Sequence, residues 1–252
     1  MHKQSKRRAV QVFIFFIFSL ALFYPDNEGK AAEEQQDLVW SQSDGLRYEI
    51  FTSTKTSGKW STPVQITDNN ANNLHPVLDI GINGTKWLFW SAVRPNGISV
   101  QYAVFKNKEW SEPQNLPLEQ NSAITPFVLA DKKGGVWLVW AGNDGGNDDI
   151  YYSHYQGKKW TDPQVLHAAN EVPDIKPVIQ YNDEGNIEVS WVGYRGEAYV
   201  KLFSVYSKKT GWSEEQEKQE ETKEEEVQEE EEQEIELPSF VPSDSQYFLK
   251  VY

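Results

Sequence analysis

The stretch PFVLADKKGGVWLVWAGNDGGNDDIYYSHYQGKKWTDP, residues 126–163, contains one complete repeat unit. Three of its segments are rich in β-branched and aromatic residues, and Gly, Asp and Asn separate them, as is typical of short strands joined by turns. A fourth segment begins at Trp160. The stretch therefore predicts four antiparallel strands within about fifty residues, which is the size of a β-propeller blade.

The same pattern recurs along the chain. Tryptophans at two positions of the unit repeat at intervals of 50 to 52 residues, and prolines and glycines keep the same phase. The repeating positions are Trp40, Trp90, Trp140 and Trp191; Trp60, Trp110, Trp160 and Trp212; Pro76, Pro126 and Pro177; and Gly84, Gly134 and Gly185. We expect an all-β fold of about four propeller blades over residues 37–213, with these tryptophans packed between the sheets.

The strands of the second unit are expected at residues 76–82, 87–92, 98–105 and 110–116. The first unit begins with DLVW at Asp37 and so lacks its first strand. Residues 246–252 are aromatic and β-branched, and we expect them to supply this strand and close the ring, because propellers are often sealed by pairing their two termini. The alternative is an unpaired tail.

Residues 1–31 have the layout of a secretory signal. Basic residues precede an apolar run at 12–24, Pro25 follows it, and cleavage is expected after Ala31. An uncleaved segment that anchors the chain in a membrane is the alternative, although the run is shorter than the usual span. The protein is therefore expected to be secreted or held at the cell surface. The basic residues are Lys3, Lys6, Arg7 and Arg8.

Composition excludes several classes of function. The chain has no cysteine, which rules out disulfides, thiolate chemistry and lipid attachment through cysteine. Residues 214–236 hold fourteen Glu and two Lys, a net charge of −12 out of −14 for the whole chain. This segment is expected to be a solvated, low-complexity linker before the C-terminal segment 237–252. Because the remainder is nearly neutral, nucleic-acid binding is not expected.

The octapeptide SHYQGKKW, residues 153–160, resembles the Asp-box of sialidase-type repeats, which has Ser, Asp, Gly and Trp at its first, third, fifth and eighth places. Tyr155 stands at the Asp place. The phrases WSTP, WSEP and WTDP extend a degenerate resemblance to the sialidase superfamily over residues 37–212. It implies a propeller. Sialidases of that superfamily have six blades and an arginine triad whose first motif is absent from this sequence, so no catalytic role is carried over.

Three arginines follow the signal, and each lies shortly after a tryptophan of the second strand. In a propeller, the connections from second to third strands share one face, so we expect the arginines to form an anion or glycan site there. The third unit places three acids in the same connection, where one of them could act as a general acid. The alternative is a set of solvent-facing turn residues. The candidates are Arg47, Arg94, Arg195, Asp144, Asp148 and Asp149.

Metal sites and cofactors are not expected. The loop 143–149, with its Asp, Asn and Gly, suits calcium in residue type, but turns favour the same residues. His75, His154 and His167 are too isolated for a zinc site.

We therefore predict an exported, non-catalytic module that binds a glycan or protein partner. The alternatives are a sialidase-like glycoside hydrolase and a subunit whose ring is completed in an oligomer.

Overall fold

The structure, a computed structural model, describes most of the chain between the predicted signal and the C-terminus. Every helix or strand in the described ranges is a β-strand, so the all-β prediction is confirmed. The predicted signal at 1–31 and most of the acidic segment 214–236 lie outside them. The described residues are 35–118, 122–143, 145–167, 170–218 and 237–252.

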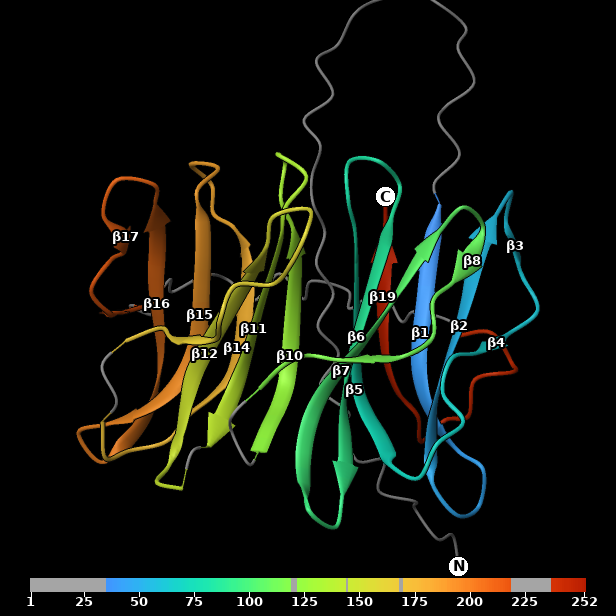
Figure 1. The fold of residues 1–252 in the computed structure, drawn as a ribbon, viewed down its shortest axis with the longest axis horizontal. Helices are drawn as coiled ribbons and strands as arrows, with labels where there is room; N and C mark the ends of the chain where they lie inside the picture. The colour runs from blue at the N-terminus through green and yellow to red at the C-terminus, as the bar shows by residue number, and fades with distance from the viewer. Residues whose placement is uncertain (1–34, 119–121, 144, 168–169, 219–236) are drawn as a thin grey trace, which may run out of the picture.

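The strands form three hydrogen-bonded sheets of five, nine and five strands. The nine-stranded sheet divides where β7 meets β10 in parallel, and we describe its two antiparallel parts separately, as sheets II and III between sheets I and IV (Figure 1). Sheet I contains β19 (Gln246–Val251), β1 (Gln36–Ser43), β2 (Tyr48–Thr56), β3 (Lys59–Trp60) and β4 (Val64–Gln65). Sheet II contains β5 (Asn72–Ile80), β6 (Lys86–Arg94), β7 (Gly97–Lys106), β8 (Glu109–Trp110) and β9 (Gln114–Asn115). Sheet III contains β10 (Ser122–Ala130), β11 (Val136–Asn143), β12 (Asp148–Tyr155) and β13 (Gln164–Val165). Sheet IV contains β14 (Asp174–Tyr181), β15 (Ile187–Arg195), β16 (Ala198–Ser207), β17 (Gly211–Trp212) and β18 (Gln216–Glu217).

Because the strands are antiparallel, the connections between them lie at two opposite edges of the sheets. The turns from first to second strand and from third to fourth strand lie at the upper edge, at the top of Figure 1, together with the C-terminus. The turns from second to third strand, and the links between sheets, lie at the lower edge. One parallel pairing, Ser122 with Ile98, also joins sheets II and III.

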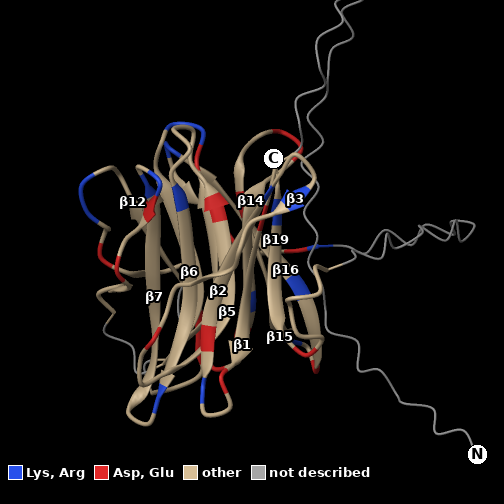
Figure 2. Cartoon of the chain, turned by 90° about the vertical axis from the view of Figure 1, so that its right-hand side faces the viewer, with Lys and Arg blue, Asp and Glu red and all other residues tan. Residues whose placement is uncertain are grey.

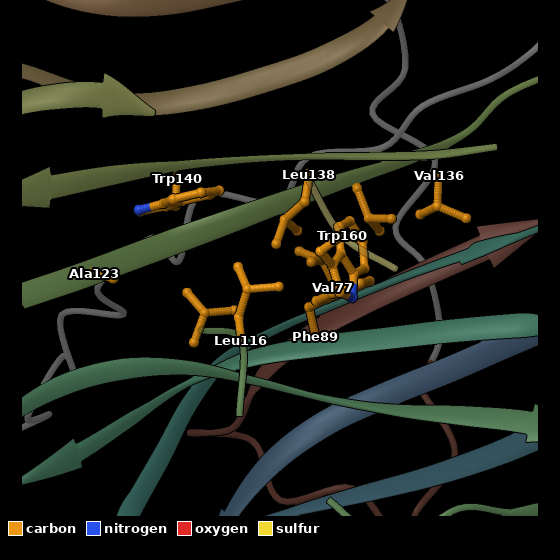
Figure 3. Packing of buried hydrophobic residues seen from close by; sticks show 10 residues of the cluster. Val77, Phe89, Leu116, Ala123, Val136, Leu138, Trp140 and Trp160 are labelled. Carbon is orange, nitrogen blue, oxygen red and sulfur yellow. The ribbon is translucent and has the colours of Figure 1, made fainter. Parts of the chain in front are cut away.

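Trp90, Trp140 and Trp191 of the first series are buried between neighbouring sheets. Trp40 is equally buried, but on the outer face of sheet I, against Phe240, so the prediction that it packs between two sheets is wrong. In the second series, Trp160 reaches across to the neighbouring sheet and meets Trp87 edge to face, with ring centroids 6.0 Å apart. Figure 3 shows Trp160 among apolar side chains of sheets II and III. Large aromatic side chains therefore fill the space between the sheets, as the repeat predicted.

The innermost strands begin earlier than predicted, because each contains a β-bulge. In β5, β10 and β14 the register shifts immediately around the repeated proline. The residue before it has a left-handed backbone, with φ of 54° at His75, 48° at Thr125 and 55° at Lys176. A bulge interrupts the ladder where proline has no N–H to donate, which explains why the sheets tolerate proline here. The outermost strands are shorter than predicted: 110–116 is divided between β8 and β9.

β19 supplies the strand that the first unit lacks. It pairs antiparallel with β1 along six residue pairs, from Gln36 with Val251 to Ser41 with Gln246. It does not close a ring, however. β19 packs beside β5, β5 beside β10, and β10 beside β14, but no comparable packing links β14 to β19 among the described strands. The four sheets form an open arc.

The two outer faces of the arc differ. On the outer face of sheet I, Phe240 packs on Trp40 with ring centroids 5.6 Å apart, together with Leu237 and Val241. The outer face of sheet IV differs from the equivalent face of sheet III at two positions. Where sheet III presents apolar side chains to its neighbour, sheet IV has Glu188 and Ser190. Val178 and Phe203 lie opposite Ser190 on the same face and are half-buried, so this face mixes polar and apolar side chains.

Candidate ligand-binding site

A groove with a volume of about 550 Å³ lies at the lower edge between sheets I and II. One wall consists of Gln65 at the end of β4 and residues 66–69 of the link between the two sheets. The other consists of Arg94 at the end of β6, Gln101 in β7, and the bend at Glu112 and Pro113. All but two of these nine residues are polar. The groove therefore offers hydrogen-bond donors and acceptors instead of an apolar surface.

Hydrogen bonds within the walls hold the polar side chains in place. The Gln65 side-chain amide donates to the Thr67 carbonyl oxygen at 2.7 Å, and the Asn69 side-chain oxygen accepts the Ala71 N–H at 2.8 Å. Gln101 is only 6% exposed and donates to the Asn115 side chain at 2.9 Å. Its side-chain oxygen has no hydrogen-bond partner among the described residues. Gln101 thus forms a fixed part of the groove wall.

The guanidinium group of Arg94 has most of its hydrogen-bonding capacity unused. Its Nη1 donates to the Ser99 hydroxyl at 3.2 Å, and it forms no ion pair with any carboxylate in the described part of the chain. Guanidinium groups bind carboxylates through two parallel hydrogen bonds. Asp68 and Glu112 line the same groove without pairing with Arg94.

Arg195 occupies the equivalent position in sheet IV, at the end of β15, and is fully engaged. It lies 3.2 Å from Asp174 and 2.8 Å from Glu215, which it also meets through a second hydrogen bond of 3.1 Å. Hydrogen bonds from Arg195 lower the pKa of Glu215, against the effect of burial. Those bonds, chiefly that with Glu215, also raise the pKa of Arg195. This arginine serves the structure of its own sheet.

Two substitutions explain why Arg94 is unpaired. The repeat aligns Asp174 with Asn73 and Glu215 with Pro113. Both carboxylates that hold Arg195 are therefore absent around Arg94. Asn73 instead accepts the Trp90 indole N–H at 2.9 Å, a contact between buried groups that needs no charge. Sheet II thus keeps the arginine and lacks the acids that would neutralise it.

Glu49 lies behind the groove wall. Thr67 donates a hydrogen bond to its carboxyl oxygen, and Asn73 donates another at 3.0 Å. Burial raises the pKa of Glu49 despite these bonds.

Because the folded state disfavours the charged form of Glu49, the contribution of this group to stability is largest below its ordinary pKa and is lost as the pH rises through the raised value. We expect Glu49→Gln to gain stability relative to the wild type as the pH is raised from 4 to 8. Urea unfolding at pH 4, 6 and 8 measures this gain. A constant difference between the two proteins at all three values would contradict it.

The other predicted site residues have separate surroundings. Arg47 hydrogen-bonds to Asn70. Asp148 accepts a hydrogen bond of 3.2 Å from Asn143. Asp149 is buried and lines a small cavity between sheets III and IV with His167. Asp144 lies outside the described residues. The structure therefore places Arg94 in the groove and gives Arg47 and Arg195 partners of their own.

The sequence matches no protein-family model and no curated protein. Solved structures resemble the fold at low identity. A protein of unknown function from Dyadobacter fermentans has a TM-score of 0.49 and 16% identity, over 66% of this chain and 50% of that one. An endo-arabinase from Bacteroides thetaiotaomicron has a TM-score of 0.49 and 14% identity, over 72% of this chain and 75% of that one. The Hadza microbial sialidase Hz136 has a TM-score of 0.45 and 14% identity, over 67% of this chain and 45% of that one. This chain thus spans half the length of the first of these proteins.

Sequence reasoning missed the polar wall residues Asp68, Asn69, Gln101 and Glu112, because none has a motif. The signal that could have revealed the groove is the loss of Asp and Glu from the repeat around Arg94. Within the described ranges, no cluster of three or more His, Asp or Glu residues could hold a metal ion. Nor do those ranges contain a helix long and apolar enough to cross a membrane.

Proposed function

We propose that the protein is an exported module that binds an acidic glycan in the groove between sheets I and II. The observation that supports this most directly is the guanidinium of Arg94, which pairs with no carboxylate of the described residues and lies beside the side-chain amides of the groove wall. A sugar carboxylate would pair with Arg94. Neighbouring hydroxyls, which both donate and accept hydrogen bonds, would meet the amide groups.

The proposed architecture is a propeller of four blades that remains an open arc. The outer face of sheet I is covered by Leu237, Phe240 and Val241, which favours a monomer over an oligomer that completes the ring through that face. Mass measurement in solution tests this. Export is proposed from the sequence of residues 1–31, and N-terminal sequencing of the protein outside the cytoplasm should begin at Ala32.

Arg94→Ala is expected to weaken binding of an acidic oligosaccharide at least tenfold, since a hydrogen-bonded charge pair contributes about 1.5–3 kcal/mol. The measurement is a glycan array that carries sialylated and uronic-acid oligosaccharides, followed by calorimetry on the best ligand. Lys201→Gln is the control, because it removes one positive charge from an exposed site on sheet IV.

Pro113→Glu provides a second test that leaves Arg94 in place. It restores to sheet II the acid that pairs with Arg195 in sheet IV, and should therefore neutralise Arg94 and reduce binding by a similar factor. Acidic glycans that bind the wild type, Arg94→Ala and Pro113→Glu equally well would rule out this groove as the site.

A glycoside hydrolase is the second candidate, because two carboxylates, Asp68 and Glu112, line the same groove. Such enzymes use a pair of carboxylic acids around the scissile bond. Incubation of the best-bound oligosaccharide with the wild type, Asp68→Asn and Glu112→Gln decides between the two functions. Product that appears with the wild type and disappears in both variants would establish hydrolysis. Binding without product supports the non-catalytic module.

A further inference from the structure

A second cavity, of about 700 Å³, opens at the upper edge between sheets III and IV, at the opposite edge from the Arg94 groove. Its walls are the turn 131–135 of sheet III, the turn around Asn186 of sheet IV, and the ends of β12 and β16. Three lysines, Lys132, Lys133 and Lys208, line it from both sheets. It is larger than the Arg94 groove. Its lining has more lysines than acids, whereas the groove is lined by one arginine and two acids.

One lysine of this cavity is held in position. The Lys132 ammonium lies 4.2 Å from the centre of the Tyr181 ring, and the Lys132 backbone N–H donates to the Tyr181 hydroxyl at 2.8 Å. Because Tyr181 belongs to sheet IV and Lys132 to sheet III, this double contact fixes the lysine across the mouth of the cavity. A cation on an aromatic face keeps its other hydrogen-bond donors available.

The carboxylate of Asp131, which lines the cavity, already has partners within the protein. Asp131 accepts backbone hydrogen bonds from Lys133 at 2.7 Å and from Gly135 at 2.9 Å, and it lies 3.4 Å from His154. His154 in turn stacks on the Trp137 indole, with ring centroids 4.0 Å apart. Asp131 thus organises the turn and the aromatic floor, and the lysines carry the net positive charge of the cavity.

The whole upper edge is positive around this cavity. Its turns carry nine exposed lysines and three exposed acids, Glu109, Asp183 and Glu184. Figure 2 shows basic residues in the turns along this edge. A one-signed edge raises the local concentration of oppositely charged ligands and speeds their encounter. The lysines are Lys59, Lys106, Lys108, Lys132, Lys133, Lys158, Lys159, Lys208 and Lys209.

We propose that this cavity binds a ligand through phosphate or sulfate groups. Lysine ammonium groups suit such oxyanions as compact point charges, and three lysines line this cavity, which is large enough for a ligand with several anionic groups. The aromatic floor of Trp137 and Tyr206 would contact the rest of the ligand. The site is independent of the Arg94 groove.

Calorimetry with the full chain tests the proposal, with inorganic tripolyphosphate and sucrose octasulfate as probes. We expect at least one probe to bind at 50 mM NaCl and to bind at least tenfold more weakly at 500 mM, because salt screens exposed charges. Binding of tripolyphosphate alone identifies phosphate as the preferred group, binding of the octasulfate alone identifies sulfate, and binding of both identifies a general oxyanion site.

The triple variant Lys132→Gln/Lys133→Gln/Lys208→Gln should lose at least tenfold in affinity for the bound probe. The matched control, Lys59→Gln/Lys106→Gln/Lys108→Gln, removes the same charge from the same edge over sheets I and II and should stay within about twofold. Equal losses in the two triple variants, or no binding of either probe to the wild type, would overturn the proposal. Arg94→Ala should bind the probe normally, which separates this site from the glycan groove. Circular dichroism confirms that each variant is folded.

Discussion

Trp90→Ala is expected to lower the free energy of unfolding by about 3–5 kcal/mol, the usual cost of truncating a buried tryptophan. Trp90 is fully buried between sheets I and II, within a cluster that includes Val39, Ile50 and Leu88. Its indole N–H also satisfies Asn73. Truncation would leave a cavity and an unpaired polar group together, which places the expected loss toward the upper part of the range.

Urea unfolding followed by circular dichroism measures this loss. Ile82→Ala is the control, because Ile82 is 71% exposed and its truncation should change stability by less than about 0.5 kcal/mol. A loss below about 1 kcal/mol for Trp90→Ala would contradict the packing of the two sheets described above.

Deletion of residues 246–252 is expected to be the other large perturbation, with a loss of roughly 4 kcal/mol or more. The deletion removes the whole ladder to β1 together with Tyr247, Phe248 and Leu249, which pack into the clusters on the two faces of sheet I. It would leave the inner edge of β1 unpaired, and a long unpaired edge promotes aggregation.

Thermal unfolding and amide hydrogen exchange of β1 and β2 report the effect of this deletion. Tyr252→Phe is the control: it keeps the strand and removes only the 2.9 Å hydrogen bond to Asp37, which still contacts Lys86 at 2.6 Å. We expect that variant to lose about 1 kcal/mol. Unchanged exchange in β1 after the deletion would show that the C-terminal strand does not stabilise sheet I.

The periodic tryptophans and prolines were sufficient to predict an all-β fold of repeated antiparallel strands, because each repeat needs the same large side chains against its neighbours. The second strand of sheet II was predicted at 87–92 and lies at Lys86–Arg94. The bulge before Pro76 was not predictable, since it depends on which backbone groups face an unpaired edge. The closure of the ring by the C-terminal strand was predicted and an incomplete ring was kept as an alternative; the spacing of the repeat could not decide between them, and the sheets are not closed.

The candidate site was only partly predictable. The sequence drew attention to Arg94 as one of three arginines that appeared equivalent. Their difference arises from the residues opposite them, Asn73 and Pro113 in sheet II against Asp174 and Glu215 in sheet IV. Such partners are far apart in sequence, so pairing must be known before the free arginine can be identified. The lysine-lined cavity was not predicted at all, because its walls come from turns of two sheets.

The pairing of β1 with β19 has a consequence for how the molecule is made. Sheets II to IV consist of consecutive residues and can form as soon as those residues are available, whereas sheet I joins Gln36 to Val251. Contacts between residues so distant in sequence form slowly, because a long loop must be closed first. Sheet I is therefore expected to be the last of the sheets to form, after β19 has been synthesised.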